Sequence, residues 1–210
     1  VVNEPLHKPP PFKEGLGGDG ETGWDWVIRS FELAMGYFPN AILTVNDYNI
    51  LIREEFTASY LPIIDALDER GLVDAIGVQG HFLEQADPAV VAANLDRLAA
   101  TGLGIYVTEF DVNYADDARQ AGVFSDLVAT FYENPAVLGV TAWGHLQGAI
   151  WRQDAWLLDA GSNPRPALDW LVCYRAGGED CPVPVYTPTP REGDAAGLLI
   201  EVESYDDAEG

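Results

Sequence analysis

The sequence predicts an α/β fold in which short parallel β-strands alternate with longer α-helices. Five short apolar segments in the first 172 residues alternate with amphipathic segments of helical spacing. The short segments are apolar on both faces, which is typical of a parallel sheet packed against helices. Polar residues follow them at their carboxyl ends, where a (β/α)₈ barrel gathers functional groups from several strands. A doubly wound open sheet is the alternative, but a dinucleotide-binding version would need a glycine-rich turn after its first strand, and none occurs there.

The element boundaries follow from the apolar patterns and the capping residues. Strands are predicted at residues 1–3, 41–45, 74–79, 104–109 and 137–143, the second of them buried. Helices are predicted at 24–35, 54–70, 88–100 and 117–132, and a last helix opens at 166–173. Gly71 suits the end of the second helix, and Asp87 the start of the third. Because a barrel of this class closes with eight strands, the five predicted here would be its fourth to eighth, and the barrel would be incomplete.

Composition divides the chain into three parts. Residues 1–181 would form the C-terminal part of a barrel, 182–196 a Pro/Thr-rich linker, and 197–210 the truncated start of a second domain. A disordered acidic tail is the alternative for the last part. Cys173 and Cys181 lie close together, which favours a small disulfide-closed loop of an extracellular protein over two unpaired thiols.

The charge of the chain limits its partners. The 210 residues carry a formal net charge of −23. Nucleic acid and anionic membranes are not expected as partners, because both require clustered Lys and Arg, whereas a neutral polysaccharide is compatible. No segment is apolar for long enough to span a bilayer. The first residues already have a strand pattern without an initial Met, so we expect the sequence to begin partway into a gene for a secreted protein.

Two glutamates stand out among the polar residues at the strand ends. Glu4 follows the first strand and Glu109 ends the fourth. One such carboxylate alone would more often cap a helix or pair with an arginine. Two of them match what cleavage of a glycosidic bond requires, namely one carboxyl group to protonate the leaving oxygen and another on the opposite side of the anomeric carbon. Other polar and aromatic residues follow the strands in the same way: Asn3, Asn46, Gln79, His81, Asp111 and Trp143.

Two of these residue types have a structural alternative. His81 alone would more often be a structural histidine, but its place two residues after Gln79 and its possible partner Asp111 favour a role in the site. Trp143 alone would suit a core; with Trp151 beyond it, we favour surfaces against which the C–H faces of sugars pack. A zinc site needs more clustered ligands than occur here, so no metal is expected.

Six segments, taken together and in order, resemble the family-10 glycoside hydrolases, the (β/α)₈ endo-1,4-β-xylanases. The segments are VVNEP (1–5), NDYNI (46–50), IGVQGHF (76–82), YVTEFDV (106–112), TAWG (141–144) and NPRPALDWL (163–171). The resemblance covers about residues 1–172, and the three N-terminal strands of the family are absent.

The resemblance implies a role for each residue of the site. Glu4 matches the general acid/base of the family, and Glu109 matches its nucleophile. Asn3 matches the residue that binds the 2-hydroxyl of the sugar under attack, and Gln79 a group beside the acid/base. His81 matches the histidine that orients the nucleophile, and Asp111 matches the partner of that histidine. Trp143 and Trp151 match the aromatic residues nearest the cleavage point. Asn46 and Tyr48 match residues that contact sugars on the leaving-group side.

These matches imply a retaining endo-1,4-β-xylanase that hydrolyses internal bonds of xylan without a cofactor. Since the family places much of its non-reducing-side sugar binding on the absent strands, we expect the isolated fragment to have little or no activity. A β-1,4-glucan hydrolase and a non-catalytic carbohydrate-binding fragment are the alternatives. The tail LLIEVESYDDAEG (198–210) is similar to the opening strand of a family-6-type carbohydrate-binding module.

Overall fold

The computed structural model describes residues 1–178 and 180–186. One parallel sheet contains the strands in chain order: β1 (Val2–Asn3), β2 (Thr44–Asp47), β3 (Ala75–Gln79), β4 (Gly104–Phe110) and β5 (Val137–Ala142). The helices are α1 (Asp25–Tyr37), α2 (Glu54–Asp68), α3 (Pro88–Ala99), α4 (Asp117–Glu133) and α5 (Pro166–Arg175), with 3₁₀ turns η1 (Lys13–Leu16) and η2 (Leu83–Gln85). The predicted α/β class and the five parallel strands are confirmed, and this sheet is consistent with part of a barrel.

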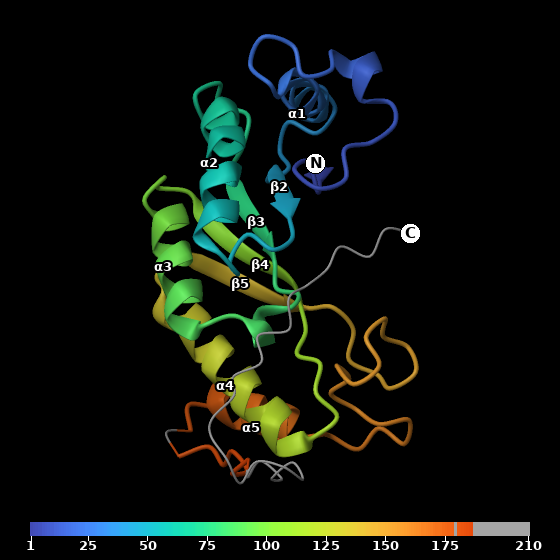
Figure 1. The fold of residues 1–210 in the computed structure, drawn as a ribbon, viewed down its shortest axis with the longest axis vertical. Coiled ribbons are helices and arrows are strands. Elements are labelled where there is room, and N and C mark those ends of the chain that lie inside the picture. Colours follow the sequence, from blue (N-terminus) through green and yellow to red (C-terminus); the bar gives the residue numbers. More distant parts are fainter. Residues whose placement is uncertain (179, 187–210) are drawn as a thin grey trace, which may run out of the picture.

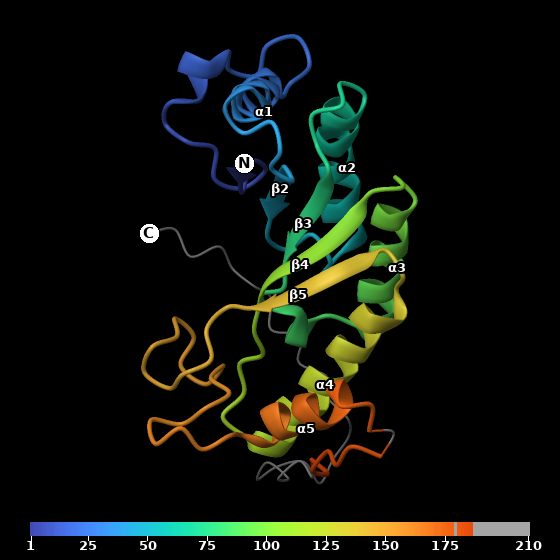
Figure 2. The same ribbon diagram turned by 180° about the vertical axis from the view of Figure 1, so that it is seen from behind.

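The core lies between the sheet and the helices. Val45, Ile76 and Ile105 stand in register on neighbouring strands and are completely buried. Their branched side chains suit extended backbone and pack against apolar helix residues. Figures 1 and 2 show α2, α3 and α4 together on one face of the sheet, with α5 against α4. Because the strands are parallel, their carboxyl ends lie at one edge of the sheet. The long loop between β5 and α5 lies below this edge in Figure 1.

The second strand differs from its predicted bounds. The prediction of a buried strand at 41–45 was wrong for its first residues, because Ile42 is 67% exposed and regular pairing starts at Thr44. The N–H group of Leu43 donates to the Asp74 carboxylate at 2.7 Å instead of entering a strand ladder. Asn46 and Asp47 become the last two residues of β2, so they remain at the carboxyl end of the sheet as predicted.

The predicted capping residues lie at or near the ends of their helices. Asp87 accepts a hydrogen bond from the N–H of Ala89 at 2.8 Å and caps α3. Gly71 adopts a φ of +61° just beyond α2, a conformation that glycine tolerates better than other residues. No helix of the described part of the chain is long and apolar enough to cross a membrane.

The C-terminal region contains the expected disulfide. Cys173 of α5 and Cys181 are bonded, with their Cα atoms 5.7 Å apart, so the alternative of two free thiols was wrong. The predicted linker at 182–196 is described only as far as residue 186. The predicted start of a second domain at 197–210 lies outside the described residues.

Candidate active site

Glu4 and Glu109 both leave regular strand conformation at the carboxyl edge of the sheet. Their φ angles are +57° and +54°, in the left-handed region that residues other than glycine seldom adopt. The N–H of Glu4 donates to the backbone carbonyl of Asn46 at 2.7 Å, which holds it against β2. Glu109 lies where the register between β4 and β5 is interrupted, between Val107 and Phe110. Such irregularities turn a side chain away from the normal strand alternation, and here both carboxylates are turned toward one space.

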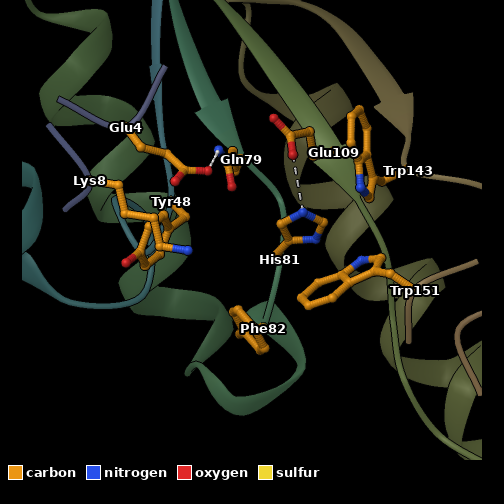
Figure 3. Close-up of a pocket in the computed structure, with 9 residues that line it drawn as sticks. All are labelled: Glu4, Lys8, Tyr48, Gln79, His81, Phe82, Glu109, Trp143 and Trp151. Atoms are coloured by element: carbon orange, nitrogen blue, oxygen red, sulfur yellow. Dashed lines mark hydrogen bonds and ion pairs between the residues drawn. The ribbon is translucent and has the colours of Figure 1, made fainter. Parts of the chain in front are cut away.

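A pocket of about 330 Å³ separates the two carboxylates. Figure 3 shows Glu4 on one side of it and Glu109 on the other, with Gln79 between them. The lining residues are Glu4, Lys8, Tyr48, Gln79, His81, Phe82, Glu109, Trp143 and Trp151. Seven of these nine were predicted site residues, and the other three predictions, Asn3, Asn46 and Asp111, hydrogen-bond to residues that line the pocket.

Two side-chain amides hold the Glu4 carboxylate. Asn3 Nδ2 donates to Glu4 Oε1 at 3.1 Å, and Gln79 Nε2 donates to the same oxygen at 3.0 Å. Gln79 Nε2 also lies 3.2 Å from Asn3 Oδ1. The two amides orient the carboxyl group toward the pocket.

Asn46 links the two halves of the site. Its Nδ2 donates to Asn3 Oδ1 at 2.8 Å and to Glu109 Oε1 at 2.9 Å, and its Oδ1 accepts from Thr108 Oγ1 at 2.6 Å. A Cβ atom on Gly77 would lie 2.8 Å from Asn46 Oδ1, so a glycine is needed where this amide crosses β3. Both N–H bonds of Asn46 are thus taken by protein oxygens, while its predicted contact with a sugar stays a prediction.

His81 stands between Glu109 and Asp111. Its Nε2 is 3.3 Å from Glu109 Oε2, and its Nδ1 is 2.9 Å from Asp111 Oδ2. Asp111 Oδ2 also accepts from the indole N–H of Trp151 at 2.9 Å. A neutral imidazole carries one N–H. In that form His81 can donate to Glu109 or to Asp111, but not to both.

A largely buried arginine side chain, 10% exposed, extends this chain of contacts and was not predicted from the sequence. Arg152 donates to Asp111 Oδ1 at 2.7 Å and forms an ion pair with Glu84, and its guanidinium lies 4.7 Å from the centre of the Phe82 ring. Burial alone would lower the pKa of Arg152, but hydrogen bonds to Glu84 and Asp111 outweigh it and raise the pKa above its usual range. Arg152 therefore remains charged and fixes one oxygen of Asp111.

The loop after Glu4 is attached to β2 through a buried carboxylate. Asp47 accepts the N–H of Leu6 at 2.8 Å and lies 2.7 Å from His7 Nδ1. Burial raises the pKa of Asp47, and the hydrogen bonds from His7 and Leu6 act in the opposite direction. The His7 ring lies against Tyr48, with ring centres 4.1 Å apart. These contacts place Tyr48 and the loop beside Glu4.

The two tryptophans of the site are exposed to the pocket. Trp143 is 48% exposed and Trp151 57%, so a core role for Trp143 is wrong. Both rings meet His81 edge-on, with ring centres 6.3 Å and 4.9 Å away. Large exposed aromatic faces beside polar groups are surfaces on which sugar rings pack.

Comparison with known proteins identifies the family and relatives of this chain. Residues 1–174 match the family described as Glycosyl hydrolase family 10. Endo-1,4-beta-xylanase B of Cellvibrio japonicus is 34% identical over 177 residues, which are 82% of this chain and 28% of that protein. The anti-sigma-I factor RsgI6 of Acetivibrio thermocellus is 30% identical over 182 residues, covering 82% of this chain and 23% of that protein.

A solved structure has the same fold over most of the chain. Native xylanase 10B from Thermotoga maritima superposes with a TM-score of 0.69 at 28% identity, covering 80% of this chain and 56% of that one. The chain spans about a quarter of the length of the two curated relatives. Because the family match covers most of the described residues, this chain belongs to glycosyl hydrolase family 10.

Proposed function

We propose that this chain is the C-terminal part of the catalytic barrel of an endo-1,4-β-xylanase, with Glu4 as general acid/base and Glu109 as nucleophile. The observation that carries the proposal is that the two carboxylates lie on opposite sides of one pocket with different hydrogen-bond partners. Relatives named as endo-1,4-β-xylanases support xylan as the substrate.

The proposed reaction has two displacements. Protonated Glu4 donates its proton to the glycosidic oxygen while Glu109 attacks the anomeric carbon, so the bond to the leaving sugar breaks as a glycosyl ester forms on Glu109. Glu4, now a carboxylate, then takes a proton from water, whose oxygen attacks the same carbon and releases Glu109. The configuration of the sugar is retained because the anomeric carbon is inverted twice.

The surrounding side chains serve different parts of this reaction. Asn46 and His81 hold the two oxygens of Glu109 in place for attack. Asn3 lies where it is expected to meet the 2-hydroxyl of the sugar under attack, and Trp143 and Trp151 would pack against that sugar. Tyr48, on the Glu4 side of the pocket, would contact the leaving sugar.

The sheet also supports a need for further strands. A closed barrel of this class has eight parallel strands, and this sheet has five, with apolar side chains such as Val1 and Leu138 more than half exposed. We therefore propose that the active form is a longer protein that contains three more βα units. The disulfide is typical of secreted proteins and supports an extracellular location for it.

Two rate comparisons test this proposal. The longer protein should hydrolyse xylan much faster than carboxymethylcellulose; the reverse order would favour a β-1,4-glucan hydrolase. Residues 1–186 alone, which retain the disulfide, should release little aryl alcohol from an aryl xylobioside. Turnover near that of the longer protein would contradict the need for the additional strands.

A non-catalytic carbohydrate-binding role is the second candidate. It is favoured by one observation, that a relative with similar coverage is named as an anti-sigma-I factor rather than a hydrolase. A longer protein that binds xylan in a pull-down but never hydrolyses it would support this role.

A further inference from the structure

His7 has no role in the reaction described above, and it is not among the described residues that line the pocket. Its side chain is 19% exposed, and its imidazole ring lies against the ring of Tyr48, with ring centres 4.1 Å apart and 30° between the planes. Tyr48 does line the pocket, on the same side of it as Glu4 in Figure 3. His7 therefore reaches the site through Tyr48.

Two further contacts restrict the imidazole ring of His7. Its Nδ1 lies 2.7 Å from Oδ1 of Asp47, whose side chain is completely buried, and Nδ1 donates to this carboxylate when it is ionised. The ring of Phe56 in α2 meets the imidazole edge-on, with ring centres 5.8 Å apart. The hydrogen bond and the ring contacts together hold the imidazole in its orientation.

Asp47 also fixes Tyr48 and the loop after Glu4 to each other. Its Oδ1 accepts the N–H of Tyr48 at 2.8 Å in addition to the contact with His7. Its Oδ2 accepts the N–H of Leu6 at 2.8 Å. A buried carboxylate requires such donors, and here they come from the two segments that carry the stacked rings. The rings of His7 and Tyr48 are therefore placed against each other by one group.

The hydrogen bond to Asp47 does not by itself explain a histidine at position 7. An asparagine would supply an amide donor, but it would not supply a ring against Tyr48. Under the proposed function Tyr48 contacts the leaving sugar, and a side chain that is fixed before the sugar arrives loses less conformational entropy on binding. The ring of His7 thus has a consequence for sugar binding that its hydrogen bond alone lacks.

We propose that His7 is a positioning residue, whose ring holds the Tyr48 side chain in the orientation that receives the sugar on the leaving-group side of the pocket. The inference rests on the proposed function and adds to it a residue that acts from outside the pocket lining. A contact with Tyr48 that serves the bound sugar before and during the reaction alike should affect KM more than kcat.

The test uses the longer protein and two substrates, one with sugars on the leaving-group side and one without. Xylotetraose places sugars there, whereas the leaving group of β-xylobiosyl fluoride is a single atom. His7→Ala should lower the ratio of kcat/KM on xylotetraose to kcat/KM on the fluoride by about two- to tenfold, the range of one aromatic contact, mainly through a higher KM for xylotetraose. An equal loss on both substrates, or no loss on either, would overturn the inference.

Two further variants separate the ring from the hydrogen bond. His7→Phe keeps a ring against Tyr48 and removes the donor to Asp47, whereas His7→Asn keeps an amide donor and removes the ring. The ratio should follow the ring, so His7→Phe should retain most of it and His7→Asn should lose as much as His7→Ala. The free energy of unfolding in urea should follow the hydrogen bond, so His7→Asn should be the more stable of the two. A ratio restored by His7→Asn and not by His7→Phe would show a merely structural role.

A double-mutant cycle gives the same answer even if His7→Phe does not fold. Because His7 acts through Tyr48, adding His7→Ala to Tyr48→Ala should lower the ratio little further, and multiplied losses would overturn the inference. Asp74→Ala is the matched control, because it removes a similar hydrogen bond, to the N–H of Leu43 at the other end of β2. It should leave the ratio unchanged, and a fall equal to that of His7→Ala would count against the inference.

A binding measurement separates this inference from the proposed function. Calorimetry with xylotetraose needs no turnover. In a protein that hydrolyses neither substrate, weaker binding by His7→Ala in the presence of Tyr48 but not in its absence would keep the positioning role and reject the enzyme. Hydrolysis of both substrates at a ratio that does not depend on His7 would keep the enzyme and reject the positioning role.

Discussion

The two carboxylates of the pocket are held in different ways. Glu109 has a partner at each oxygen, Asn46 at Oε1 and His81 at Oε2, and His81 is itself anchored by Asp111. Among residues 1–178 and 180–186, the side chains that donate to the Glu4 carboxylate are Asn3 and Gln79, and both donate to the single oxygen Oε1. One carboxylate is fixed at both ends, and the other keeps an oxygen turned to the pocket.

This difference suits two different tasks. A nucleophile must be aimed at one carbon, and contacts at both of its oxygens give Glu109 a fixed orientation. A group that gives up a proton and later takes one back needs an oxygen that is not occupied by a protein donor. The asymmetry of the hydrogen bonds thus predicts which glutamate performs which step.

Replacement of Glu109 tests this assignment with the largest expected effect. Glu109→Gln keeps the shape of the side chain but removes the nucleophile, so kcat on xylan should fall roughly 10⁴-fold or more, as when the central group of a catalytic unit is lost. The loss should be similar for a substrate with a good leaving group, because attack on the anomeric carbon is needed for either. A variant that retains a tenth of the activity would contradict the assignment.

Replacement of Glu4 should depend on the leaving group. Glu4→Gln should lower kcat/KM on xylan by roughly 10²–10⁴-fold, the usual contribution of a general acid. The loss should be far smaller on a dinitrophenyl xylobioside, whose leaving group departs without a proton. The rates of Glu109→Gln and Glu4→Gln on the two substrates can be compared directly. If Glu4→Gln lost the same fraction of kcat/KM on both substrates, the two glutamates would no longer be distinguished.

The contribution of the Arg152 ion pairs should be measurable as a change in the free energy of unfolding. Arg152→Met leaves the buried carboxylates of Glu84 and Asp111 without their cation and should lower the free energy of unfolding by about 3 kcal/mol, while kcat falls more than KM rises. Arg29→Met is the matched control, because the pair of Arg29 with Glu32 is exposed and should contribute less than about 1 kcal/mol. Equal changes in the free energy of unfolding of the two variants, measured by urea denaturation, would show that the Arg152 ion pairs stabilise the protein no more than the exposed pair of Arg29.

The smallest effect is expected from a region outside the pocket. Cys173→Ser opens the disulfide to Cys181 and should lower the free energy of unfolding by about 2 kcal/mol through the greater entropy of the unfolded chain. Since neither cysteine lines the pocket, kcat at 25 °C should not change. A large loss of kcat would mean that the site depends on overall stability and would weaken the Arg152 comparison.

The sequence predicted the residues that stand at the ends of strands better than those that support them. Glu4, Gln79 and Glu109 directly follow or end apolar segments, so the sheet alone brings them to one edge. The start of β2 was misplaced because the apolar run at 41–43 looks like a strand, whereas Asp74 takes the N–H of Leu43 in a contact between residues 31 positions apart.

The supporting residues could not be predicted for a similar reason. The pair of Arg152 with Glu84 joins the loop between β5 and α5 to η2, across 68 positions of sequence, and no local pattern links them. The only local signal was that Arg152 directly follows the predicted Trp151.

The most direct test of the two-glutamate assignment is trapping of the glycosyl ester. A 2-fluoro-xyloside with a good leaving group slows the second displacement more than the first, so the longer protein should accumulate one covalent sugar. Peptide mass spectrometry should locate that sugar on Glu109, and Glu109→Gln should not be labelled. A sugar on Glu4, or rapid hydrolysis of xylan without any labelled peptide, would contradict the assignment.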